Sequence, residues 1–248
     1  YQLGDRVQPG DVIAQLNAAS LSAALQQAQA TVAAQQATLE GLQAGPQSTT
    51  VAESQAALKV AQQNLANLYA SIDSAATSAY TSGNDAVRTQ MYPLFSNAET
   101  SQPQLSFTTS NSQATVSAQN LRVAASTELN EWAQELTNIS ASSSPSALTA
   151  TLNGDLAHLA VIGNLLNTVS TALGSNASLS ATQLAADQAD VSAGLKEVNA
   201  AVSNLETISQ NISAQQATVA QAEASLAVAQ TGSTPQAIAA QEAQVQEA

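Results

Sequence analysis

VSAGLKEVNAAVSNLETISQNISAQQATVAQAEASL, residues 191–226, repeats an apolar residue at every seventh position. The row consists of Val191, Val198, Leu205, Ile212, Val219 and Leu226. A second row is offset by four positions and is more polar; it contains Leu195, Val202, Ser209, Gln216 and Glu223. Rows that repeat every seven residues share one face of a helix, as in a coiled coil. The stretch therefore predicts a long helix that packs against another helix.

A comparable pattern runs through residues 21–79, nearer the start of the chain. Its first part steps by alternating intervals of four and three: Leu21, Leu25, Ala28, Val32, Gln35, Leu39 and Leu42. Gly45-Pro46 is a typical helix exit, and Thr50 with Glu53 matches a capping box that restarts the helix. The second part contains Val51, Leu58, Ala61, Leu65, Leu68, Ile72, Ala75 and Ala79.

The two patterned regions carry similar breaks, which predicts how they pair. LQAGPQSTTVAESQAAL (42–58) and AQTGSTPQAIAAQEAQV (229–245) both place a glycine and turn residues before an Ala/Gln-rich helix. In the second, Thr234 is placed to cap the helix and Pro235 suits its first position. An antiparallel pair with Pro46 beside Gly232 sets residues 50–80 against 199–229 and residues 31–44 against 235–248. Residues 18–30 then lack a partner, so we expect the chain to be a piece of a larger protein.

The middle of the chain has a different composition. Residues 69–132 hold six of the seven aromatic side chains. Two helical stripes follow: the first comprises Leu129, Trp132, Leu136 and Ile139, and the second Leu148, Leu152, Leu159, Ile162, Leu166, Val169 and Leu173. Turn residues stand at 142–145 and 174–176. We expect residues 81–185 to form an inserted bundle of three or four helices at the far end of the hairpin.

The composition excludes several classes of function. Acidic residues outnumber basic ones 18 to 5, giving a net charge of −13, so nucleic acid is not an expected partner. Without cysteine the chain forms no disulfide, and a single histidine offers little to a metal. We find no run of about 18 apolar residues and expect no membrane span.

Residues 4–16, GDRVQPGDVIAQL, are the only strongly strand-like part of the chain, with turns at Gly4-Asp5 and Pro9-Gly10. Biotinyl and lipoyl carrier domains share such a run, but they need a modifiable lysine just after it, and here the next lysine is Lys59. The run, the helix start from Leu21 to Ala28 and the paired breaks together resemble HlyD-like membrane fusion proteins, also called periplasmic adaptor subunits. The resemblance covers residues 3–80 and 185–248.

This resemblance implies a split lipoyl domain whose halves are separated by a long α-helical hairpin. It also implies an inner-membrane transporter of the ABC or RND type as partner, assembly as a homo-oligomer, and a place on the extracytoplasmic face of the cytoplasmic membrane. An anchor would lie outside this chain. Adaptors that dock on outer-membrane channels carry an Arg-x-x-x-Leu-x-x-x-x-x-x-Ser tip pattern. Here Arg6, Arg88 and Arg122 are followed four positions later by Gly10, Tyr92 and Ser126, so none of them matches. The sequence therefore argues against docking on such a channel.

The sequence offers no catalytic, cofactor-binding or metal-ligating set. His158 stands in an apolar stripe, and we interpret it as a structural histidine because a site needs partners. Glu128, Glu131 and Glu135 share one helix face, which we interpret as solvated rather than as a cation site. Asp187 and Asp190 lie in a helix without a nearby glycine loop and suggest no acid–base pair.

Two sets of residues remain open to a functional interpretation. Gln35 and Gln216 occupy core heptad positions, where a polar residue selects one register; lateral contact between neighbouring hairpins is the alternative. Four aromatic residues are candidates for a docking surface, although a role in the bundle core is favoured: Tyr92, Phe95, Phe107 and Trp132.

We therefore expect a mostly α fold: a long antiparallel coiled-coil hairpin, an inserted bundle, and a short β half-lipoyl segment. The expected parts are residues 1–17 (half-lipoyl), 18–80 (ascending arm, broken at 45–49), 81–185 (insert) and 186–248 (descending arm, broken at 231–234). The expected function is that of an adaptor in efflux or secretion and not that of an enzyme. The alternative is a surface coiled-coil stalk that carries a sensor-like ligand-binding bundle, with Tyr92, Phe95 and Trp132 lining the pocket.

Overall fold

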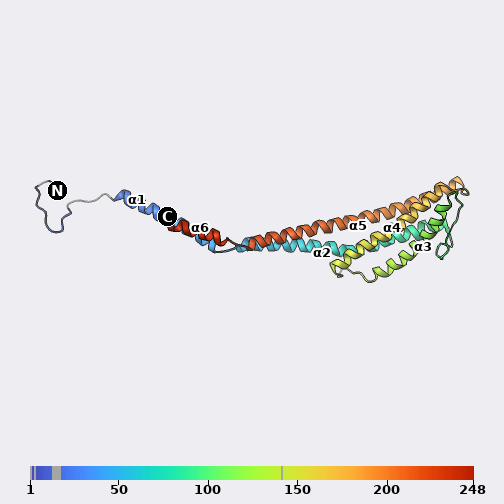
Figure 1. Cartoon of the computed structure of the whole chain (residues 1–248), viewed down its shortest axis with the longest axis horizontal. Coiled ribbons are helices and arrows are strands. Elements are labelled where there is room, and N and C mark those ends of the chain that lie inside the picture. The colour runs from blue at the N-terminus through green and yellow to red at the C-terminus, as the bar shows by residue number, and fades with distance from the viewer. Residues whose placement is uncertain (1, 3, 13–17, 141) are drawn as a thin grey trace. The chain divides into compact units, whose positions relative to one another are not determined.

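The computed structural model of the chain describes residues 2, 4–12, 18–140 and 142–248. The structure is mostly helical, with 79% of the described residues in helices, and its arrangement is hairpin-like. Its long helices are α1 (Ala19–Gln43), α2 (Ser48–Asp85), α3 (Ser112–Leu136), α4 (Pro145–Gly174), α5 (Ala181–Gln230) and α6 (Pro235–Glu247) (Figure 1). After α2 follow the short elements η1 (Ala86–Gln90, a π-helix), η2 (Tyr92–Leu94), β1 (Phe95–Ser96) and β2 (Gln104–Leu105).

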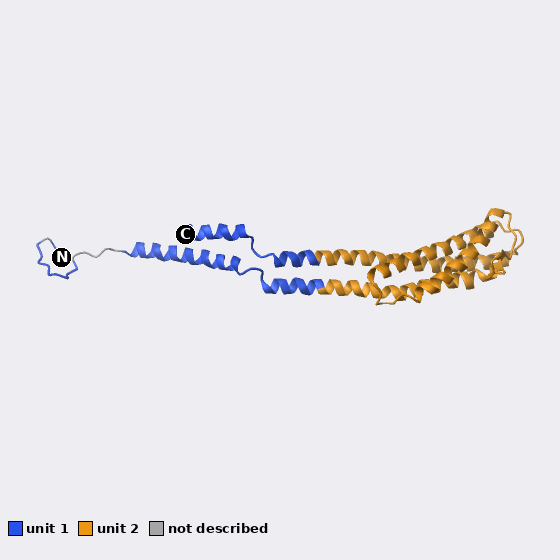
Figure 2. Ribbon diagram, turned by 60° about the horizontal axis from the view of Figure 1, so that its bottom comes forward, with its two compact units in different colours: residues 1–58, 222–248 blue, residues 59–221 orange. Residues whose placement is uncertain are grey.

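The chain divides into two compact units, which Figure 2 distinguishes by colour. Unit 1 comprises residues 1–58 and 222–248, and unit 2 comprises residues 59–221, so α2 and α5 contribute to both. The expected boundaries at residues 80 and 185 fall within α2 and α5. Neither helix ends there: the buried positions of α2 run across residue 80, from Ala79 to Gly83, and α5 already begins at Ala181.

In unit 1 the two helix breaks lie side by side, in the register that the sequence predicts. Gly45 and Gly232 have φ values of +77° and +59°, the left-handed conformation in which a glycine commonly ends a helix. A Cβ atom at Gly232 would lie 3.2 Å from Cδ of Pro46. Beyond the breaks, the side-chain amide of Gln241 in α6 donates to that of Gln35 in α1 at 2.6 Å. The Thr234 cap is also confirmed, since its hydroxyl accepts from the Ala237 amide at 3.2 Å.

One expected helix start is wrong. The helix α2 begins at Ser48, so Thr50 lies inside its first turn and does not cap it with Glu53. The amide of Val51 instead donates to the Gln47 carbonyl, which sets the helix start nearer to Pro46. At the other end of α1, Leu21 and Leu25 are exposed, as expected for the residues without a facing segment.

In unit 2 the helices α3 and α4 lie beside α2 and α5 and share one core with them (Figure 1). All seven positions of the predicted 148–173 stripe are buried. The heptad row of α5 is buried from Val191 to Ile212 and half-buried at Val219. Opposite it, the side chain of Gln215 donates to the Ala61 carbonyl of α2 at 3.0 Å, which matches the predicted antiparallel register.

Helices α3 and α4 therefore do not form an independent bundle of three or four helices within residues 81–185. They pack on α2 and α5, and a glycine of α2 permits the close approach. A Cβ atom at Gly83 would lie 2.8 Å from Cδ1 of Ile162 and 3.1 Å from Cζ3 of Trp132. The arms themselves supply the rest of the core.

Helix α4 is long and apolar enough to cross a membrane by length and composition. It is still not a continuous apolar run, because polar residues such as Asn153, Asp155 and Asn164 interrupt it, as the sequence predicts. The core helix of a soluble bundle passes the same test. In unit 2, 44% of the most apolar window of α4 is buried against the rest of the unit, including Leu159 and Ile162.

The expected half-lipoyl segment lies partly outside the described residues, because these omit residues 13–17. In residues 4–12 the structure has turns and no strand. The amide of Gln8 donates to the Asp11 carboxylate at 2.8 Å, around the Pro9-Gly10 turn. The lipoyl assignment stays a prediction.

Candidate functional site

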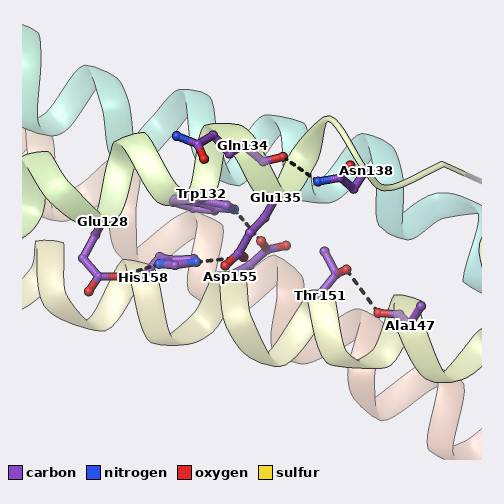
Figure 3. A network of polar contacts seen from close by, with 9 residues as sticks. All are labelled: Glu128, Trp132, Gln134, Glu135, Asn138, Ala147, Thr151, Asp155 and His158. Atoms are coloured by element: carbon purple, nitrogen blue, oxygen red, sulfur yellow. Dashed lines mark hydrogen bonds and ion pairs between the residues drawn. The ribbon is translucent and has the colours of Figure 1, made fainter.

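A polar network joins α3 and α4 inside unit 2, with His158 at its centre (Figure 3). The Nδ1 atom of His158 lies 2.6 Å from Oε2 of Glu128, and its Nε2 atom lies 3.2 Å from Oε2 of Glu135. Each ring nitrogen thus faces a carboxylate, an acceptor of hydrogen bonds. A neutral imidazole has a single N–H donor, so only the protonated ring satisfies both contacts as a donor.

Asp155 is the most deeply buried acidic group of the network, at 1% exposure. Its Oδ1 atom accepts a hydrogen bond from the indole N–H of Trp132 at 2.5 Å, while its Oδ2 atom is buried without a partner. Burial raises the pKa of Asp155 from 3.8 to about 6, partly opposed by the Trp132 bond and the nearby His158. The Trp132 ring also stacks on His158, with centroids 5.1 Å apart, and meets Tyr80 edge-on.

The structure divides the predicted acidic face of α3. Glu128 and Glu135, seven residues apart, bind the two sides of one histidine. Glu131 and Glu135 are both exposed, as a solvated face requires, but the sequence does not predict the pairing of Glu128 and Glu135 with His158. His158 is buried at 7% exposure and bonded, consistent with a structural role.

Asp155 is not among the residues predicted from the sequence, although the pattern contains a signal for it. Leu148, Leu152, Leu159, Ile162 and Leu166 leave one gap in a four-three alternation, and Asp155 fills it. A carboxylate at such a core position needs a hydrogen-bond donor on the facing helix. Trp132, the only tryptophan of the chain, supplies that donor.

A pocket of about 470 Å³ opens beside this network, between the end of α3 and the start of α4. It is lined by Glu135, Asn138, Ile139, Ala147, Ala150, Thr151 and Gly154. Glu135 belongs both to the pocket and to the His158 network. The network therefore places a partly exposed carboxylate at the edge of an otherwise mostly apolar hollow.

The predicted aromatic docking set is split by the structure. Phe95, Phe107 and Trp132 are buried at 5%, 5% and 0% exposure, while Tyr92 is 56% exposed. The three aromatic residues expected to line a sensor pocket, Tyr92, Phe95 and Trp132, thus include two core residues. The favoured interpretation as core holds for all of the set except Tyr92.

The two predicted register glutamines have different environments. Gln35 is half-buried and pairs across unit 1 with Gln241, which is 8% exposed and was not predicted as a register residue. Gln216 is exposed, and its amide donates to the Tyr69 hydroxyl in unit 2 at 2.8 Å. Both contacts cross between the arms, which fits the register interpretation of these positions.

A second polar cluster holds the segment between η1 and α3. The buried Arg122 donates to Glu99 at 2.6 Å and to the Ser126 hydroxyl, and its guanidinium lies over the Phe95 ring. Arg88 lies 4.0 Å from the same glutamate and donates to Asn130. Since Glu99 is half-exposed, these contacts are those of a loop anchor at the surface of the core.

The remaining predicted acidic positions lie on α5. Asp187 is buried and accepts from the side chain of Gln183 at 2.7 Å, and Asp190 is half-buried. Nearby, burial and the charge of Asp85 raise the pKa of Glu197.

Among the described residues, no group of three histidine or acidic side chains has the geometry to hold a metal ion. The chemistry that the network does offer is proton binding and the attraction of positive charge. A scan against models of protein families, a search of curated proteins and a search of solved structures each returned no match.

Proposed function

We propose that this chain is the helical part of an extracytoplasmic adaptor, or membrane fusion protein, of an efflux or secretion system. The observation that carries the proposal is the pairing of two arms from opposite ends of the sequence, with matched breaks. Gln35 meets Gln241 in unit 1, and Ala61 meets Gln215 in unit 2. Residues far apart in the chain are thus arranged as an antiparallel hairpin requires.

The sequence supplies the support for the family. A lipoyl-like run, GDRVQPGDVIAQL, precedes the first arm, and HlyD-like adaptors place their hairpin between the halves of a lipoyl domain. We propose that residues 1–17 are the first half of such a domain. We also propose that the seven-residue rows of the arms form a coiled coil whose alanines permit close packing.

The proposed action is mechanical and not enzymatic. Copies of the hairpin would assemble side by side into a tube or cage, and the assembly would couple to an inner-membrane permease of the ABC or RND type. It would guide the substrate outward and transmit the conformational changes of the transporter. The missing Arg-x-x-x-Leu pattern argues against docking on an outer-membrane channel.

A second candidate is a surface stalk that carries a ligand-binding helical bundle. The pocket beside Glu135 favours it, because a hollow at the meeting of two helices is a usual place for a ligand. The pocket differs from the one the sequence suggested, since Tyr92 and Trp132 do not line it. The lipoyl-like run weighs against this candidate, because a stalk has no need of half a lipoyl domain.

The test is affinity purification of the tagged protein from detergent-solubilised native membranes, with mass spectrometry of the proteins that co-purify. Leu205→Asp is the disrupting variant, because Leu205 is fully buried, and Ser203→Asp is its exposed control on the same helix. The adaptor proposal predicts an exporter permease or ATPase with the native chain and the control but not with Leu205→Asp. A purification at good yield that contains no transporter contradicts it and favours the stalk.

A further inference from the structure

We propose that the pocket between α3 and α4 binds a small organic cation, an amine that carries an apolar body. The pocket lies wholly within unit 2 and is lined by Glu135, Asn138, Ile139, Ala147, Ala150, Thr151 and Gly154. This inference does not depend on the adaptor proposal, since it rests on the lining of the pocket and on the charges beside it.

The polar groups that line the pocket are hydrogen-bond acceptors, so they suit a ligand that donates. Glu135 is 58% exposed, and its Oε2 atom faces His158, which leaves Oε1 for a ligand. The Thr151 hydroxyl donates to the Ala147 carbonyl at 3.1 Å, and the Asn138 amide nitrogen donates to Gln134 at 3.1 Å. Their oxygen atoms remain as acceptors. An ammonium group carries three donors and matches such a set.

The local charge favours a cation as well. Three carboxylates, those of Glu128, Glu135 and Asp155, surround one histidine, so the cluster stays negative even when the imidazole is protonated. Asp155 lies next to Gly154 in the chain and has a buried oxygen without a partner. None of the five basic residues of the chain lines the pocket: Arg6, Lys59, Arg88, Arg122 and Lys196.

The rest of the lining accounts for the apolar body. Ile139, Ala147 and Ala150 provide a hydrocarbon wall, and Gly154 leaves room beside the carboxylate. A Cβ atom at Gly154 would lie 3.8 Å from Oε2 of Glu135, so the carboxylate and the helix backbone lie close together. A neutral ligand of the same shape would gain the apolar contacts but would leave the carboxylate unpaired.

The probe is phenethylamine, with 2-phenylethanol as its neutral isostere, titrated into the whole chain at pH 7.5. Binding is followed by calorimetry and by the fluorescence of Trp132, which contacts the network directly. We expect the amine to bind saturably and at least tenfold more tightly than the alcohol. Ala150→Phe should abolish binding by filling the pocket, whereas Ala157→Phe, on an exposed position of the same helix, should leave it unchanged.

Two variants that each remove one negative charge distinguish binding at this pocket from general attraction of a cation to an acidic protein. Glu135→Gln should weaken amine binding at least tenfold, and Glu131→Gln, which removes the same charge from an exposed position of the same helix, should not. Circular dichroism checks that each variant keeps its helices. Equal binding of amine and alcohol, equal effects of the two glutamine variants, or no saturable binding would each overturn the proposal.

Discussion

Replacing Asp155 by asparagine should stabilise unit 2 at neutral pH and remove part of its pH dependence. Asparagine keeps the shape and the acceptor for the Trp132 indole but carries no charge that burial would penalise. The pKa of Asp155 rises from 3.8 to about 6 in the folded chain, so folding favours the protonated carboxyl. Its contribution to stability is complete below pH 3.8 and is lost as the pH rises through 6.

The magnitude follows from the size of the shift. A rise of the Asp155 pKa from 3.8 to about 6 corresponds to about 3 kcal/mol between the protonated and ionised forms. Lowering the pH from 7.5 to 5 should raise the free energy of unfolding by about 1 kcal/mol through Asp155 alone. Asp155→Asn should therefore exceed the native chain by up to about 3 kcal/mol at pH 7.5 and by about half as much at pH 5.

The assay is urea unfolding at pH 5, 6 and 7.5, followed by tryptophan fluorescence. Trp132 is the only tryptophan and bonds to Asp155, so the signal reports on unit 2. Asp190→Asn, at a half-buried position of α5, is the control for the loss of one charge. The reasoning is refuted if Asp155→Asn and the native chain lose stability in parallel over this range, or if the variant is the less stable at pH 7.5.

Three further predictions concern packing and register. Gly83→Val should lower the free energy of unfolding by about 1–3 kcal/mol in the same assay, because the added side chain crowds the core. Gly163→Ala is the control: its Cβ atom would make only an ordinary contact at 3.9 Å, so the free energy of unfolding should rise by up to about 1 kcal/mol. Gly232→Ala should lower the stability of unit 1 by about 1–2 kcal/mol, because residue 232 has a φ of +59°. Amide hydrogen exchange in α6 should become faster, and an unchanged exchange rate contradicts this prediction. Gln241→Leu should lower the stability of unit 1 by about 1–3 kcal/mol, because the side chain of Gln35 loses its hydrogen-bond donor. The double variant with Gln35→Leu should recover most of this loss, as followed by the same exchange measurement.

Periodicity and breaker residues were enough to predict the arms and their alignment. Gly45-Pro46 and Thr231-Gly232 are local signals, and matching them fixed the register that Gln35–Gln241 and Ala61–Gln215 display. The place of α3 and α4 was not predictable in this way. It depends on where bulky residues meet small ones in space, as Trp132 and Ile162 meet Gly83.

The candidate site was predicted only in part for the same reason. His158 and the acidic face of α3 are visible in the sequence. Whether they contact each other depends on how α3 and α4 are aligned, which residue types alone do not specify. Asp155 was hidden in an apolar stripe, and the pocket beside Glu135 arises from the crossing of two helices. Such features come from tertiary packing and leave a weak trace in the pattern of one helix.

The proposed function rests on the antiparallel pairing of arms from opposite ends of the chain, and spin-label distances test this pairing directly. The chain has no cysteine, so pairs can be introduced without a background. Labels at Asn64→Cys and Ser213→Cys, both exposed, should lie within about 25 Å, since two helices side by side span little more. Moving the second label to Ala186→Cys should lengthen the distance to about 40 Å or more along α5. Equal or broad distance distributions for the two pairs would contradict the hairpin and the adaptor proposal with it.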